Sequence, residues 1–139
     1  MTSHRFSPLA RRGASAIEMA FVAPLILLLF FAGIEFSRAN MVLNAADFAA
    51  LEGARLGILP GADSAECEAA ARTELDLLGI KNHAVNVEPA NILLTTPEVT
   101  VTVSIPFDDN LLPMSKYFVG KLLTRSITLR RENDNESGS

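Results

Sequence analysis

The carboxylate of Glu18 is the most conspicuous chemical group in this chain. It immediately precedes sixteen residues, Met19–Ile34, that carry no polar or charged side chain. An ionised carboxylate at the centre of a bilayer costs about 2.5–3.5 kcal/mol, and less near the edge. No Lys or Arg lies between Ala14 and Ile34 to neutralise it. A charge in such a place is a functional hypothesis, and Glu18 is therefore predicted to need a partner from outside this stretch.

Cleavage of the chain between Gly13 and Ala14 would supply that partner. The new α-ammonium on Ala14 would lie one helical turn from Glu18, or within its reach from a neighbouring subunit. Such an ion pair would compensate the carboxylate and could set the axial register between helices. In the alternative interpretation the chain stays uncut, and Glu18 extends its carboxylate to the headgroups at the edge of the bilayer.

Other residue types that carry out chemistry are scattered. His4 and His83 lie far apart and lack the spaced ligands of a metal site. Cys67 is the only cysteine and has no candidate base, so we expect a buried apolar residue, with an intermolecular disulfide as the alternative. The run 108–110 lacks the spacing of a calcium loop and is interpreted as a polar loop. The sequence therefore predicts no metal site, no cofactor and no enzyme.

The apolar run is long enough to cross a membrane, because about 20 residues at about 1.5 Å per residue span the hydrocarbon core. Three arginines and no acid precede Ala14, whereas eight Lys/Arg and fourteen Asp/Glu follow Arg38. Basic residues mark the cytoplasmic side, so the N-terminus is predicted inside and the acidic part outside. The run exceeds a secretory signal core and no A-x-A pattern follows it. An acidic domain is not expected to bind nucleic acid.

The helix is predicted to continue beyond the membrane as one element from Ala14 to Leu56, about 65 Å long, with a kink at Pro24. Glu35 and Arg38 are spaced to pair where it leaves the bilayer. Mostly small residues then recur at helical spacing on one stripe: Ala39, Val42, Ala46, Ala49, Gly53 and Leu56. The stripe is predicted to pack against its own domain, or alternatively against identical helices of neighbouring subunits.

The rest of the chain predicts a small α+β domain. Asp63 is expected to cap a helix that ends near Leu78 at Gly79, with an apolar face of Ala71, Leu75 and Leu78. Alternating valines and threonines predict strands at 85–87, 99–105 and 123–129. The apolar run 91–95 leaves a fourth strand open, and 111–120 is expected to hold a short helix. We predict three or four antiparallel strands covering one face of the long helix.

The stretch from Arg12 to Ala20, with Pro24, the exit at 33–38 and the pairs at 45–46 and 53–55, resembles the TadE-like pseudopilins of tight-adherence (Tad/Flp) pili. Met19 stands where that family usually has Phe or Tyr. The resemblance implies a pilin-like α+β fold. It divides the chain into a cytoplasmic leader 1–13, a transmembrane helix 14–36, its periplasmic continuation 37–57, a periplasmic domain 58–132 and a disordered tail 133–139.

The resemblance also implies a function. A prepilin peptidase would cut after Gly13, and Glu18 would become the fifth residue of the mature chain. The product would be a minor pseudopilin in the bacterial inner membrane that primes or supports pilus assembly. Its partners would be the major pilin, other minor pseudopilins, the inner-membrane assembly platform and membrane lipid. The alternative function is an uncleaved, single-pass, signal-anchored periplasmic interaction module.

Overall fold

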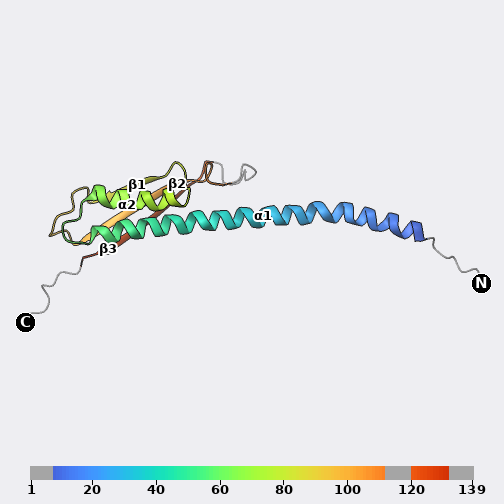
Figure 1. Ribbon diagram of the computed structural model, residues 1–139, viewed down its shortest axis with the longest axis horizontal. Helices are drawn as coiled ribbons and strands as arrows, with labels where there is room; N and C mark the ends of the chain where they lie inside the picture. Colours follow the sequence, from blue (N-terminus) through green and yellow to red (C-terminus); the bar gives the residue numbers. More distant parts are fainter. Residues whose placement is uncertain (1–7, 112–119, 132–139) are drawn as a thin grey trace, which may run out of the picture. The chain divides into compact units, whose positions relative to one another are not determined.

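The computed structural model describes residues 8–111 and 120–131. Its elements, in chain order, are α1 (Pro8–Gly57), α2 (Ser64–Leu77), β1 (Ala84–Glu88), β2 (Glu98–Pro106) and β3 (Leu122–Arg130). The long apolar helix, the second helix and the antiparallel sheet make an α+β fold, as predicted (Figure 1). The chain divides into two compact units, Met1–Ser37 and Arg38–Ser139, which are described separately below.

Helix α1 begins earlier than the sequence predicted. The helix was predicted to start at Ala14, but α1 starts at Pro8 and passes through Gly13. Proline suits the first turn of a helix because its φ is already helical and its missing N–H needs no partner there. One glycine costs about 1 kcal/mol in a helix, which is too little to stop a helix of 50 residues. Residues 1–7 lie outside the described residues.

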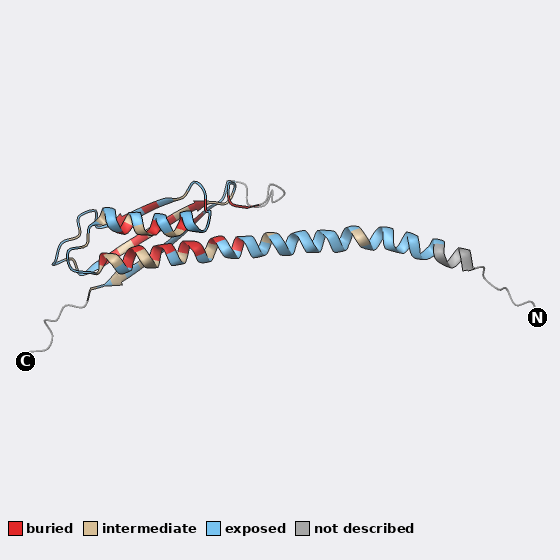
Figure 2. Cartoon of the chain, in the orientation of Figure 1, coloured by how far each residue is buried: buried red, intermediate tan, exposed pale blue. Residues whose placement is uncertain are grey.

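Small residues of α1 form one side of the hydrophobic core of the domain. All of the predicted stripe is buried except half-buried Leu56, and neighbouring alanines widen it: Ala45, Ala50 and Ala54. Figure 2 shows these buried positions along the part of α1 that belongs to the domain. A Cβ on Gly53 would lie 2.9 Å from the carbonyl oxygen of Cys67, and one on Gly57 would lie 2.7 Å from Val99. The stripe therefore packs against its own domain and is not available to neighbouring helices.

Helix α2 follows the turn after α1 and contributes a narrow apolar face. Asp63 is its N-cap residue, as predicted, but the Asp63 side chain makes no capping hydrogen bond. The buried positions are Cys67, Ala71 and Leu75, spaced four apart on one face. Leu78 was expected on this face and is instead 46% exposed, because it is the C-cap residue beyond the last turn. Gly79 ends the helix with φ at +70°, a conformation that glycine adopts without strain.

The sheet has three strands in the order β1-β2-β3, with both pairs antiparallel. Strand β2 is central, and its residues alternate between the core and the solvent face. On the solvent face, cross-strand hydroxyls form three hydrogen bonds: Thr100–Thr128, Thr102–Ser126 and Ser104–Thr124. The run 91–95 forms no strand, so the three-stranded alternative is confirmed. The expected helix near Pro113 and the tail 133–139 lie outside the described residues.

Candidate functional site

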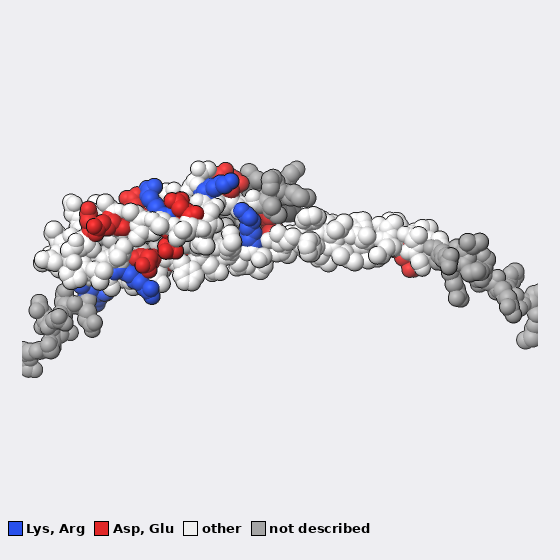
Figure 3. All heavy atoms as spheres, in the orientation of Figure 1, with Lys and Arg blue, Asp and Glu red and all other residues white. Residues whose placement is uncertain are grey.

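The described part of the N-terminal unit presents an apolar surface. Its large hydrophobic side chains, from Ile17 to Phe36, are exposed. One 18-residue window of this helix is long and apolar enough to cross a membrane, and none of it is buried. Figure 3 shows charged side chains gathered over the domain and almost none along this helix. The helix therefore fits a membrane anchor.

The predicted processing site lies at the start of this anchor. Gly13, Ala14 and Glu18 are all exposed, and a Cβ built on Gly13 meets nothing within 4 Å. Because Ala14 and Glu18 are four residues apart in one helix, they share a face at an axial separation of about 6 Å. The spacing needed for an ammonium–carboxylate pair is therefore present, while cleavage and the pair itself stay predictions.

Arg38 connects the start of the domain to a loop far along the chain. Its Nε donates a hydrogen bond of 2.7 Å to the carbonyl oxygen of Asn110. The predicted pairing of Arg38 with Glu35 stays a prediction. The Arg38 side chain leans toward the N-terminal end of α1, as side chains on a helix do. Its hydrogen bond therefore holds the 106–111 loop near the first residues of α1 that belong to the domain.

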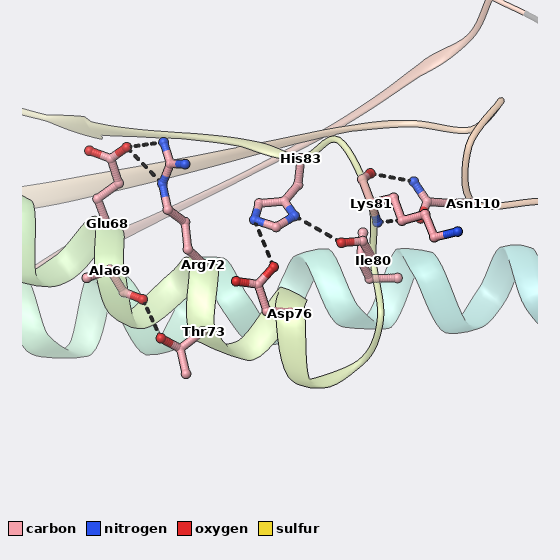
Figure 4. A network of polar contacts seen from close by, with 9 residues as sticks. All are labelled: Glu68, Ala69, Arg72, Thr73, Asp76, Ile80, Lys81, His83 and Asn110. Carbon is pink, nitrogen blue, oxygen red and sulfur yellow. Dashed lines mark hydrogen bonds and ion pairs between the residues drawn. The ribbon is translucent and has the colours of Figure 1, made fainter.

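The Asn110 side chain is the main polar contact of this end. It is 2% exposed and donates to the carbonyl oxygens of Lys81 and Pro106 at 2.8 and 2.9 Å. Its Oδ1 accepts from the Lys81 backbone N–H at 2.8 Å. Figure 4 shows how this amide joins the loop after α2. The amide's two donors and its acceptor are thus satisfied, so Asn110 fixes two loops against each other.

The neighbouring acidic residues also hold loops. Asp108 accepts hydrogen bonds of 2.9 Å from the Gly120 backbone N–H, and Asp109 accepts one of 2.8 Å from Asn82. The interpretation of 108–110 as a polar loop agrees with these contacts. No group of His, Cys, Asp and Glu with the arrangement of a metal site occurs among the described residues.

The titratable residues of α2 and of the loop after it contact other parts of the domain. Nε2 of His83 lies 3.7 Å from Asp76, and its Nδ1 donates to the Ile80 carbonyl at 3.1 Å (Figure 4). Cys67 is fully buried in the core, as predicted for a small apolar residue. Burial raises the pKa of the Cys67 thiol because the thiolate would be desolvated there. A thiol held neutral and inaccessible is not a nucleophile.

Arg131 makes the contact that the sequence analysis missed. Its guanidinium donates five hydrogen bonds of 2.9–3.1 Å to backbone carbonyls. The acceptors come from the end of α1 and from the loop before β2: Gly57, Ile58, Leu59, Leu93 and Leu94. A cation stabilises the C-terminal end of a helix, where carbonyls lack partners. The only sequence signal was an arginine directly after the last strand.

A long exposed apolar helix together with a small α+β domain fits the class of membrane-anchored domain proteins. Within this class, residues 13–55 match the family model described as TadE-like protein. The match confirms the resemblance over the anchor and its continuation, and it indicates a role related to Tad pili. No curated protein and no solved structure matches the chain.

Proposed function

We propose that this chain is a minor pseudopilin that primes or supports the assembly of a Tad/Flp pilus. It is made as a prepilin and cut after Gly13. The observation that carries the proposal is the family match, which begins at Gly13 and covers both the exposed anchor and the buried part of α1. The chain then acts as an assembly subunit and not as an enzyme.

Cleavage gives Glu18 its counter-charge. At about 6 Å and an effective dielectric constant of about 20, an ammonium and a carboxylate attract each other by about 3 kcal/mol. This equals the cost of about 2.5–3.5 kcal/mol for a carboxylate at the bilayer centre. The uncut precursor lacks this compensation between Ala14 and Ile34. A pair formed with the Ala14 terminus of a neighbouring subunit would fix the axial offset between the two helices.

The partners follow from this role. The prepilin peptidase acts on the cytoplasmic side, where the helix around Gly13 must open to expose the peptide bond. Glycine lowers the free energy of that opening by about 1 kcal/mol relative to alanine. The inner membrane then holds helix 14–36, the domain lies in the periplasm, and the chain meets the major pilin, other minor pseudopilins and the assembly platform.

N-terminal sequencing of the protein from cells with an active prepilin peptidase tests the processing step. The proposal expects Ala14 as the new terminus, and Gly13→Ile should leave the precursor intact. Gly33→Ile serves as a matched control, since Gly33 lies in the same helix and a Cβ there also meets nothing within 4 Å. An intact N-terminus in the unaltered protein would instead favour an uncleaved, signal-anchored interaction module.

Substitution of Glu18 tests the ion pair. Glu18→Ala should insert into the membrane as well as the unaltered protein, because the change removes a charge from lipid. Pilus formation, counted by electron microscopy, should fall, whereas Ser15→Ala should leave it unchanged. Normal piliation with Glu18→Ala would show that the carboxylate does not set the register between helices.

A further inference from the structure

Strand β3 has an edge that no described strand occupies. Among residues 8–111 and 120–131, β3 pairs with β2 alone. Nine residues at about 3.3 Å each give an edge of about 30 Å. Unpaired backbone N–H and C=O groups along such an edge are a template for association.

The β3 side of the domain is basic. Residues 121–131 contain four basic side chains and no acid: Lys121, Arg125, Arg130 and Arg131. Asp47 lies 3.3 Å from Arg125, and Glu98 is opposite Arg130 in the strand register. The carbonyls that bind Arg131 carry no net charge, so they do not neutralise it. Counted with Asp47 and Glu98, the four basic side chains leave the β3 side a formal charge of +2, four positive minus two negative, and Lys121 also makes a contact within the chain.

The opposite side of the domain is acidic. Strand β1 forms the other edge of the sheet, and α2 packs beside it. Residues 63–77 contain five acidic side chains and one basic one, Arg72, which pairs with Glu68. The Asp76 side chain is 71% exposed, and Figure 3 shows acidic atoms over α2 on the visible face. The two edges of one sheet thus carry opposite charge.

We propose that the β3 edge binds the α2–β1 side of a second copy of this chain. Strands β1 and β3 run in the same direction, since both are antiparallel to β2. Two copies of the domain related by a translation can therefore place β3 of one beside β1 of the other in parallel. A twofold β3–β3 contact would need opposed strands and would bring basic residues together. The strand directions and the charges belong to the domain alone, so the contact does not depend on cleavage of the chain.

The contact joins two different surfaces, so each copy keeps one unused edge, and the association extends instead of closing as a dimer. Opposite charges steer the copies together and disfavour the reverse arrangement. Both surfaces are largely solvated, and charges farther apart than about 8 Å are screened at 0.15 M salt. The association is thus expected to weaken as salt rises.

The test measures fluorescence energy transfer between two differently labelled preparations of the full chain in detergent micelles. Lys121→Glu/Arg130→Glu and Glu66→Lys/Asp76→Lys should each lower self-association at least about tenfold. An equimolar mixture of the two variants should restore transfer, because each supplies the charge that the other lacks. Circular dichroism confirms that both variants are folded.

Arg55→Glu is the matched control, since it reverses a 63% exposed cation on α1 that belongs neither to β3 nor to the α2–β1 side. It should leave transfer unchanged. A lack of self-association in the unaltered chain overturns the proposal, as does a mixture of folded variants that fails to restore transfer. Either result leaves the cleavage test untouched, so failure of this inference is distinguishable from failure of the proposed function.

Discussion

Replacement of Arg131 by alanine should destabilise the domain by about 3–6 kcal/mol. Two of its five hydrogen bonds, to Gly57 and Ile58, are partly buried, and the other backbone bonds to Leu59, Leu93 and Leu94 are exposed. Water replaces the exposed bonds at little cost, whereas each partly buried bond to a charged donor contributes about 1.5–3 kcal/mol. Arg131→Lys should lower the free energy of unfolding by about 1–2 kcal/mol, because an ammonium lacks the planar, forked arrangement of donors of the guanidinium.

Urea unfolding of the full chain in micelles measures this loss, with alkylation of Cys67 as the probe. Cys67 is fully buried, so it reports opening of the domain and not of the membrane helix. Arg130→Ala is the matched control, because Arg130 is the exposed neighbour of Arg131 in sequence. The reasoning is refuted if Arg131→Ala unfolds within about 0.5 kcal/mol of the unaltered chain, or if Arg130→Ala costs as much.

Three further outcomes are expected in the same unfolding assay. Gly53→Ala should lower the free energy of unfolding by about 1–3 kcal/mol through overpacking, because the new Cβ would meet a backbone carbonyl at 2.9 Å. Gly33→Ala should leave the free energy of unfolding unchanged, because a Cβ there meets nothing within 4 Å. Asn110→Asp should lower the free energy of unfolding by about 2–4 kcal/mol, since aspartate cannot donate to the two carbonyls that the amide binds. Unchanged stability would contradict the role given to Asn110. Alkylation of Cys67 at pH 8 should be about a hundredfold slower in the folded chain than in urea, since burial raises the thiol pKa; equal rates would disprove its burial.

Periodicity made most of the fold predictable. The alternation of Val99 to Ile105 identified β2, because a half-buried strand places every second side chain in the core. Small residues at helical spacing identified the buried face of α1, because a sheet can approach a helix closely only over such residues. The apolar length of the anchor follows from bilayer thickness alone. These patterns are local, so the sequence displays them directly.

The predictions that were wrong or absent concern the ends of helices and contacts between residues far apart in the sequence. Leu78 repeats the spacing of the α2 face but lies beyond the last turn, where that spacing no longer determines direction. The leucines at 93 and 94 suggested a strand, yet they are 63% and 72% exposed in a loop held by Arg131. No period in the sequence relates Arg131 to the end of α1. Of the candidate site, the spacing of Gly13, Ala14 and Glu18 was readable, and the contacts of Arg38 with Asn110 were not.

The Arg131 contacts also determine when the domain can be completed during synthesis of the chain. The carbonyl of Gly57 accepts a hydrogen bond from Arg131, which is synthesised 74 residues later. At about 5–20 residues per second, that interval lasts about 4 to 15 s. Until Arg131 is synthesised, the end of α1 and the 93–94 loop lack their common donor. The domain is thus completed only when the arginine at position 131 joins the end of α1 to the loop before β2.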